Sequence, residues 1–466
     1  MTSSTVETCT IKPTSKYNRS PSASTITLHG LDLISAPVHI SNHRFFHRPE
    51  HLKEQDVVDT LKSSLAEALE LYPPVAGTVR ANEKGELYVA LDAEGAAFQV
   101  DRRDSPFTGD AEDLSPRPVV FLPTPSSALA VKVTQFSCGT VAVASSLHHY
   151  ISDLRGFLDF LEVWSKIARG KSIDLQAIPE DWAHTPGRFF AEDGNSLKAE
   201  TSPPAAPKGY QVMPSVSTEM PVITPAAVLK WRISASALAN LKKDLTDALT
   251  ESSDAWISTG DALTALLWSV ITRARESAKI PRTQGFGRSS VESGTETVAM
   301  AADGRERAPN KNMSGGRYLG NFNLLFMTTV SRDDLMSSDA KSTSRVALAI
   351  RSSLNEQLSP EAIKNRIRYM EAPENTQPPG RIFWTADVVF TNWCMFDLLG
   401  EDMDFGWGTP FEATGGEGVL PAGYVCLLQN KSTGDVTVIS TVEKEGLHAM
   451  QTDALMNKYA TLVKIR

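Results

Sequence analysis

Residues 141–161, VAVASSLHHYISDLRGFLDFL, join an apolar strand pattern to a helix pattern. The first part is small and apolar, as in a buried strand, whereas apolar residues after Ser152 recur at helical spacing. Ser152 is the candidate N-cap of this helix. His148, His149 and Asp153 lie at the junction. Groups that can move protons or bind metal therefore stand where a strand ends and a helix begins.

Three interpretations of this junction compete. His148, His149 and Asp153 could bind a metal ion, although a further ligand would have to come from elsewhere. The histidines could instead be a buried pair that is hydrogen-bonded to the backbone. In the third interpretation His149 is a general base and Asp153 fixes the local structure. Neighbouring side chains of a strand point to opposite faces, so only one histidine can face a cleft, and alternation alone does not say which.

The chain on both sides of the junction predicts a mixture of strands and helices. A hairpin turn is expected at Cys138 and Gly139, and Ser258 is expected to cap a helix with Asp261 as its capping-box partner. Residues 282–298 are polar and predict a surface loop. We expect strands at 24–33, 38–46, 85–92, 128–147 and 228–234, and helices at 56–72, 152–170, 237–249 and 258–276.

Prolines gather between residues 192 and 227, at positions 203, 204, 207, 214, 221 and 225. This composition predicts a stiff, extended crossing segment that is not part of a core. Because single cores stop growing well below 466 residues, we expect two domains. The predicted division is an N-terminal domain at 1–195, a crossover at 196–227 and a C-terminal domain at 228–466.

Composition excludes several classes of function. The net charge of −9 argues against nucleic acid as a partner. No run approaches the roughly 18 apolar residues of a membrane-spanning helix. The first residues, MTSSTVETCTIKPTSKY, lack the apolar core of a secretory signal, so we expect a cytoplasmic protein. Four cysteines stand far apart, which suggests neither a zinc site nor a disulfide framework.

Two motifs identify a family. HHYISD fits the HxxxD motif of BAHD acyltransferases, and residues 404–408 give their second motif, DFGWG, about 250 residues later. The chain therefore resembles this family, and it looks closer to filamentous-fungal members than to plant ones. It departs from the family in one place, because Leu154 and Arg155 separate the motif aspartate from Gly156. Weaker matches in the family's order are LYPPVAG, TGDALTALLWSVITRAR, ADGRERAPNKNMSGGRYLGN and TNWCMFDL.

The resemblance implies an α/β fold of two chloramphenicol-acetyltransferase-like domains, with mixed sheets flanked by helices and an active-site channel between them. It implies transfer of an acyl group from an acyl-CoA co-substrate to a hydroxyl, less readily an amine, of a small natural-product acceptor. It also implies a monomer with no metal and no permanently bound cofactor.

The same resemblance implies roles for individual residues. His149 would be the general base, in a ternary complex, and Asp153 would be structural and paired with Arg305. Thr391 and Trp393, with Asn392 in the usual serine place, would lie near the acceptor and the oxyanion, although Trp393 could equally be a packing residue. The other matched positions are Asp404, Gly406 and Gly408 as structural residues of the second motif, and Ser258 as a contact to coenzyme A.

Two other functions stay open at this point. A condensation-like enzyme of the same fold would take its acyl group from a carrier protein, which predicts a docking patch and no affinity for coenzyme A. A binding protein that has lost the chemistry would also keep the fold. The retained His149 argues against the binding protein, because a binder needs no base at that position.

Overall fold

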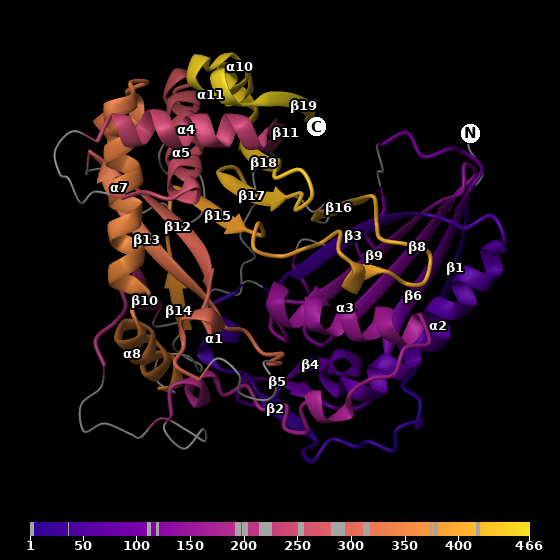
Figure 1. The fold of residues 1–466 in the computed structure, drawn as a ribbon. Coiled ribbons are helices and arrows are strands. Elements are labelled where there is room, and N and C mark those ends of the chain that lie inside the picture. The colour runs from indigo at the N-terminus through magenta and orange to yellow at the C-terminus, as the bar shows by residue number, and fades with distance from the viewer. Residues whose placement is uncertain are drawn as a thin grey trace.

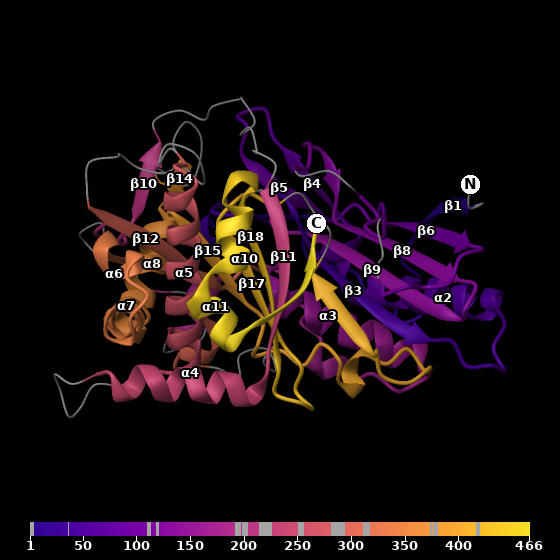
Figure 2. The ribbon, with the colours of Figure 1, turned by 90° about the horizontal axis from the view of Figure 1, so that it is seen from above.

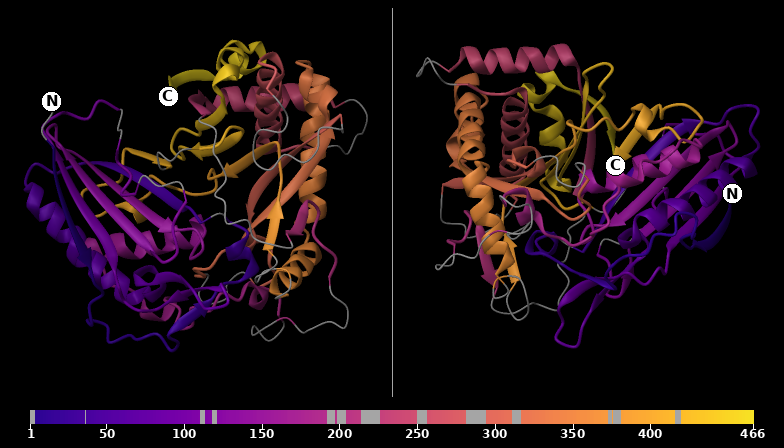
Figure 3. Two further views of the ribbon diagram at one scale, coloured as in Figure 1. Left: turned by 180° about the vertical axis from the view of Figure 1, so that it is seen from behind. Right: turned by 60° about the horizontal axis from the view of Figure 1, so that its bottom comes forward.

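Two α/β units lie side by side in the computed structural model (Figure 1). The N-terminal half of the chain forms one unit and the C-terminal half forms most of the other, and views from above and from behind show the same division (Figures 2 and 3). The structure describes residues 4–35, 37–109, 113–117, 121–191, 197, 204–213, 226–249, 256–280, 294–310, 317–372, 375, 381–415 and 420–466.

The first unit is built on a six-stranded mixed sheet with the order β1-β6-β8-β9-β3-β16. Only β6 and β8 pair in parallel, and α2 and α3 pack on the sheet through a common apolar core. Its elements are β1 (Ser4–Ile11), β3 (His39–His47), α2 (Glu54–Leu71), β6 (Ala96–Arg103), β8 (Leu129–Phe136), β9 (Thr140–His148), α3 (Leu154–Ala168) and β16 (Glu412–Gly415).

The strand-to-helix junction folds largely as the sequence predicts. β8 and β9 form a hairpin that turns at Gly139, whose φ of +84° favours glycine. In α3 the apolar stripe is fully buried, including Phe157 and Trp164. The predicted N-cap is wrong, however: Asp153 caps the helix by accepting a hydrogen bond from the Gly156 amide, while the Ser152 hydroxyl binds a backbone carbonyl.

A small second sheet, with the order β2-β5-β4-β7, sits beside the large one. The predicted strand at 24–33 is only partly right, because it ends early and a helical turn, α1, follows. The reason is local, since His29 Nδ1 accepts the Leu31 amide and Asp32 accepts the His29 amide. The elements are β2 (Thr25–Thr27), α1 (Gly30–Leu33), β4 (Thr78–Ala81), β5 (Leu87–Ala90) and β7 (Ser126–Ser127), with the 3₁₀ turns η1 (Pro73–Ala76), η2 (Leu175–Ala177) and η3 (Pro186–Phe189).

The second unit contains a seven-stranded mixed sheet with the order β13-β12-β15-β17-β18-β11-β19, flanked by helices. Its strands are β11 (Ala226–Ile233), β12 (Thr295–Asp303), β13 (Asn323–Ser331), β15 (Val388–Asn392), β17 (Tyr424–Gln429), β18 (Val436–Glu443) and β19 (Thr461–Ile465). Its helices are α4 (Ala235–Asp247), α5 (Thr259–Ser277), α6 (Arg332–Met336), α7 (Ala340–Gln357), α8 (Pro360–Glu371), α10 (Leu447–Thr452) and α11 (Ala454–Tyr459), with the 3₁₀ turns η4 (Arg305–Arg307), η6 (Glu401–Met403) and η7 (Lys444–Gly446).

Helix α5 is the central helix of this unit. Its start confirms the predicted capping box, since the Ser258 hydroxyl accepts the Asp261 amide and the Asp261 carboxylate accepts the Ser258 amide. Most of its residues are buried, as expected for a helix packed between a sheet and other helices. Neither α5 nor any other helix in the described ranges is long and apolar enough to cross a membrane.

Two predictions for the middle of the chain need correction. Part of the proline-rich segment belongs to a core, because β10 (Tyr210–Met213) pairs with β14 (Arg381–Trp384) and Tyr210 is buried. The predicted loop at 282–298 gives way to strand β12 from Thr295 onward, and residues 281–293 lie outside the described ranges. Since most of 196–227 also lies outside them, the predicted domain division stays a prediction.

One strand crosses from the second half of the chain into the first unit. β16 pairs with β3 in antiparallel register, with Glu412 opposite Phe45 and Gly415 opposite Asn42. It therefore completes the edge of the first sheet with residues that come late in the chain. This crossing ties the two units to one another by backbone hydrogen bonds.

Candidate active site

A cavity of about 1400 Å³ is lined by residues of both units. His149 and Asp153 reach it from the first unit, and Ser258, Thr391 and Trp393 reach it from the second. Four other predicted site residues, Arg305, Asp404, Gly406 and Gly408, do not line it. Five of the predicted site residues thus line the cavity, and the other four lie outside its lining.

His149 follows the last residue of β9 and is half-buried. Its amide donates to the Val38 carbonyl at 2.9 Å, which fixes the backbone at the strand end. Its ring nitrogen Nδ1 lies 3.0 Å from Asn321 Oδ1. The Asn321 Nδ2 group donates to Asp32 Oδ1 at 2.9 Å and to the His149 carbonyl at 2.7 Å. The amide oxygen must therefore accept from His149 Nδ1–H, which leaves the Nε2 lone pair unprotonated.

The environment of His149 favours the neutral ring. Burial lowers the pKa of His149, because the charged imidazolium loses solvation. The charges of Asp153 and Asp32 and the hydrogen bond to Asn321 oppose this effect without overcoming it. A neutral imidazole with a free Nε2 can accept a proton, as a general base requires.

His148 belongs to a different environment. It lies opposite His39 in the β3–β9 ladder, and its Nδ1 accepts the Tyr150 amide at 3.1 Å. Burial, with the charge of nearby groups, lowers the pKa of His148 to about 3. Asp153 turns toward an arginine, and the described residues hold no cluster of three potential metal ligands, so the structure gives no support to the metal interpretation of this junction.

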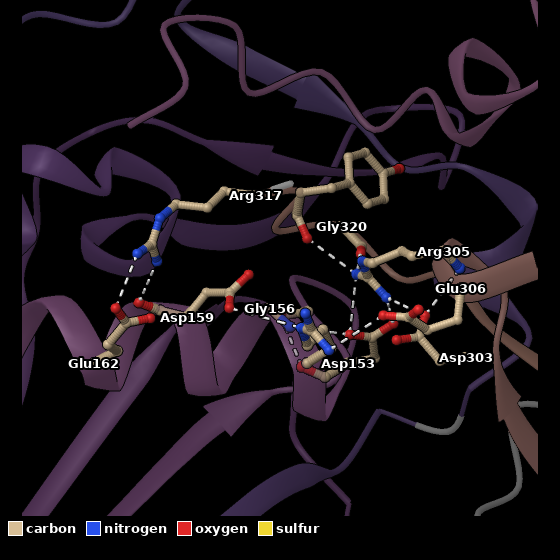
Figure 4. A network of polar contacts seen from close by, with 12 residues as sticks. Asp153, Gly156, Asp159, Glu162, Asp303, Arg305, Glu306, Arg317 and Gly320 are labelled. Atoms are coloured by element: carbon tan, nitrogen blue, oxygen red, sulfur yellow. Dashed lines mark hydrogen bonds and ion pairs between the residues drawn. The ribbon is translucent and has the colours of Figure 1, made fainter. Parts of the chain in front are cut away.

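Asp153 joins the two units through Arg305 (Figure 4). The guanidinium binds both carboxylate oxygens, with Nη1 at 2.8 Å from Oδ2 and Nη2 at 3.1 Å from Oδ1, and both side chains are buried. Burial acts to lower the pKa of Arg305, but the charges of Asp153 and Asp303 outweigh it and raise that pKa above its ordinary value. Two charges that share a dry site in this geometry form a strong and directional contact.

The pair also fixes the loop at residues 317–322. Arg305 Nη2 donates to the carbonyls of Tyr318 and Gly320, and the Phe322 amide donates to Asp153 Oδ2 at 2.7 Å. A Cβ on Gly156 would lie 2.5 Å from the Leu319 carbonyl oxygen, so α3 and the loop meet backbone to backbone. Gly156 therefore permits this close approach, although it stands two residues later than the glycine of the family motif.

Thr391 and Trp393 line the cavity from the end of β15. The indole N–H of Trp393 donates to Thr391 Oγ1 at 3.0 Å, and Asn392 Oδ1 accepts the Cys394 amide. The indole donor is therefore engaged within the protein. The Thr391 side chain also makes a hydrogen bond with Tyr424.

The DFGWG residues form a turn that packs against the first unit. Asp404 Oδ1 accepts the amides of Gly406, Trp407 and Gly408 at 2.6, 2.9 and 3.0 Å. The φ angles of Gly406 and Gly408 are +103° and +96°, which favour glycine. The Phe405 ring lies 4.8 Å from Trp164 of α3, centroid to centroid. This turn directs the chain toward β16.

Ser258 lies at the cavity with Arg307 and Arg351. Arg351 binds Asp261, with Nη2 at 2.6 Å from Oδ2. Burial lowers the pKa of the Arg307 guanidinium, and the charge of Arg351 lowers it further. The start of α5 is thus surrounded by two cations that face the same space.

The sequence reasoning missed Asn321 and Asp32. Asn321 ends the YLGN stretch that supported the family resemblance, yet it received no role. Asp32 follows His29 in a stretch expected to be a strand. Its carboxylate is fully buried and accepts from Asn321 and His184, with His184 Nδ1 at 2.9 Å. The sequence does carry one signal, since Asp32 stands between two leucines. A carboxylate that is buried in an apolar stretch needs a polar partner from elsewhere in the chain.

Comparison with known proteins gives matches along most of the chain. A model of the Transferase family matches residues 2–456. The acyltransferase uat1 of Mycosarcoma maydis is 28% identical over 43% of this chain and 44% of its own length. The hydroxycinnamoyltransferase of Narcissus pseudonarcissus is 25% identical over 91% of this chain and 93% of its own. The structure of F. graminearum TRI101 with coenzyme A and deoxynivalenol covers 95% of this chain and 100% of its own, with 18% identity and a TM-score of 0.71.

The fold and the site define an α/β transferase of two units with a histidine at the cavity between them. The chain belongs to the Transferase family, the BAHD acyltransferases, whose co-substrate is an acyl-CoA thioester and which act on small natural products. The structural match confirms the predicted fold class.

Replacing Asn321 by Ala should lower kcat. Without the amide, His149 Nδ1–H loses its acceptor and the ring loses its fixed tautomer, which would remove part of the roughly 10²- to 10⁴-fold contribution that a general base at His149 would make. Because the Asn321 hydrogen bond raises the pKa of His149, its removal should also move the acidic limb of the pH–rate profile to lower pH. Asn310→Ala, at an amide that binds the Ala191 carbonyl, is the control. An unshifted acidic limb would contradict this role.

Replacing Asp153 by Asn should destabilise the protein by about 3 kcal/mol, the lower end of the range for breaking a buried ion pair, because Arg305 loses its bidentate partner but keeps Asp303 at 3.1 Å. Thermal unfolding measures the loss, and the exposed pair of Lys243 and Asp247 gives a control, Asp247→Asn, that should change stability by less than about 1 kcal/mol. Equal melting temperatures for Asp153→Asn and the wild type would show that the pair is not a structural requirement.

Proposed function

We propose that the protein transfers an acyl group from an acyl-CoA thioester to a hydroxyl group of a small natural-product acceptor, with His149 as general base in a ternary complex. One observation carries the proposal: the His149 ring is held by Asn321 through Nδ1 in a neutral tautomer whose Nε2 is free, at a cavity between two units. The family assignment supports the same reaction.

The chemistry needs a base but no covalent intermediate. A thiol with a pKa near 8.5 is already a tolerable leaving group, whereas an alcohol is almost fully protonated at neutral pH. His149 Nε2 takes the hydroxyl proton as the oxygen attacks the thioester carbonyl carbon. The tetrahedral intermediate then breaks its carbon–sulfur bond, and His149 returns the proton to the departing sulfur. The products are an ester and free coenzyme A.

The negative oxygen of the intermediate requires a fixed donor. The Thr391 hydroxyl supports this role, because it lines the cavity and its oxygen is held by the Trp393 indole N–H. We assign Thr391 to the oxyanion and Trp393 to orienting Thr391. Trp393 therefore affects the reaction through its hydrogen bond to Thr391.

The start of α5 is the proposed contact for coenzyme A. Phosphates bind at helix N-termini and at arginine pairs. Ser258 supplies the hydroxyl at that N-terminus, and Arg307 and Arg351 line the cavity beside it. An anion placed beside Arg307 would offset the burial and the charge of Arg351, which together lower the pKa of the Arg307 guanidinium.

A hydroxyl acceptor is favoured over an amine. Aliphatic amines are mostly protonated at neutral pH, with a pKa near that of lysine. The cavity is lined by five acidic and seven basic side chains, and the excess of basic ones would disfavour an ammonium group. Among the basic ones are Arg117, Arg155, Lys230, Lys464 and Arg466.

Thermal unfolding against acyl-CoAs from acetyl to aromatic, with free coenzyme A, tests the donor first. A ligand at about 100 times its Kd stabilises a protein by about 2.7 kcal/mol, which corresponds to a shift of a few degrees. We expect shifts that depend on the acyl chain. An absence of any shift would point instead to a carrier-protein donor or to a protein that does not use coenzyme A.

His149→Ala should abolish transfer while it preserves the shift given by acyl-CoA. Because the ring is neutral and its pKa is lowered, the wild-type rate should fall only below about pH 6.5, the ordinary histidine value. His148→Ala, whose side chain does not line the cavity, is the matched control and should retain transfer. Initial rates with both substrates varied should give intersecting lines, and parallel lines would indicate a covalent intermediate.

A further inference from the structure

The cavity extends along one face of β3, away from the ring of His149. Alternate residues of that strand line it, and the chain at 114–117 lines it from the other side. We call this part of the cavity the β3 lobe. Its residues are His39, Ser41, His43 and Phe45 from β3, and Leu114, Ser115 and Arg117. Phe411, whose ring centroid lies 6.2 Å from that of Phe45, adds a second aromatic surface.

Arg117 brings a charge into this lobe that has no ion-pair partner among the described carboxylates. Its guanidinium donates to the Ser127 carbonyl at 3.3 Å and to the Ser127 hydroxyl, both of which are neutral. Within the described ranges, no carboxylate oxygen lies at ion-pair distance from Arg117, although the side chain is half-buried. A partly buried cation without a counter-ion is an unfavourable arrangement that a bound anion would improve.

Two histidines beside Arg117 can donate to the same anion. His39 Nε2 is buried and has no hydrogen-bond partner among the described residues. His43 is buried, and its Nε2 is 3.4 Å from the Ser115 hydroxyl. Burial lowers the pKa of both rings to about 4, helped by the charge of Arg117 at His39 and those of Arg466 and Lys132 at His43. The rings are therefore neutral, and each retains one N–H donor.

The remaining charges near the lobe are also mainly basic. Lys464 and Arg466 line the same cavity. The acidic side chain beside Phe45 in the ladder is Glu412, which binds Lys230 at 3.1 Å. An acidic ligand would thus meet a positive field in this lobe, and a cationic ligand would be repelled.

The lobe is close to the catalytic histidine along the backbone. His39 stands opposite His148 in the β3–β9 ladder, and the His149 amide binds the carbonyl of Val38, the residue before His39. Adjacent strands are about 5 Å apart. One small molecule can therefore span from His149 to the β3 lobe within the single cavity.

We propose that the β3 lobe binds a carboxylate of the acceptor through Arg117 and His39, while the acceptor's hydroxyl group reaches His149. The acceptor is thus a hydroxy acid with several bonds between its two polar groups. Phe45 and Phe411 pack against the carbon skeleton that joins them. This inference rests on the proposed function and adds the chemical class of the acceptor to it.

Matched acids and esters test the proposal. The probes are 3-(4-hydroxyphenyl)propanoate and 6-hydroxyhexanoate, each beside its own methyl ester, which keeps the hydroxyl and removes the charge. Calorimetric titration of the wild-type protein measures binding without turnover. We expect at least one acid to bind about tenfold more tightly than its ester, as expected for a charge-assisted hydrogen bond to arginine.

Arg117→Gln supplies the second measurement. It should remove the preference for the acid and leave ester binding unchanged, and with a transferable acid it should raise KM about tenfold with little change in kcat. Arg80→Gln, which removes an exposed arginine of the small sheet that pairs with Asp92, is the matched control and should keep the preference. If neither acid is preferred over its ester, or if Arg117→Gln weakens acid and ester equally, the proposal is wrong.

The two hypotheses fail separately in these experiments. Preferred binding of an acid without acyl transfer would overturn the proposed function and support the carboxylate site. Transfer to the esters at the same efficiency as to the acids would support the proposed function and overturn the carboxylate site.

Discussion

The buried pair of Asp153 and Arg305 is the contact on which the rest of the site depends. Removing two charges from water is costly, and attraction alone does not always offset that cost. Here both charged groups also bind the backbone. Asp153 accepts two backbone amides, and Arg305 donates to two backbone carbonyls. Each of these bonds fixes backbone at a helix start in one unit or in a loop of the other. The pair therefore sets the relative position of the two units where the cavity opens.

The tautomer and charge of the His149 ring depend on that position. The loop held by Arg305 carries Asn321, whose amide is oriented by Asp32 and in turn orients His149. Burial acts to raise the pKa of Asp32, but His184 and Asn321 outweigh it and lower that pKa. A charged carboxylate thus lies one amide away from the ring and would stabilise the imidazolium that the proposed reaction forms. The proton affinity of His149 is a joint property of both units.

The sequence predicted features that depend on neighbours along the chain. The β8–β9 hairpin follows from Gly139, and the start of α5 follows from Ser258 and Asp261 three residues apart. Other features depend on packing between distant segments. Asp32 and Asn321 are 289 residues apart, so no local pattern joins them. The N-cap of α3 was misplaced because serine and aspartate both cap helices well, and the choice between them depends on the arginine that binds Asp153.

The crossing strand β16 has a consequence for how the chain is made. Because β16 occupies the edge of β3, the first sheet stays incomplete on the ribosome until Gly415 has emerged. Until then β3 exposes unpaired backbone groups, which invite association with other nascent chains. The first half of the chain thus completes its large sheet only after the second half has been translated. Truncated forms that end before residue 412 would be natural clients of chaperones.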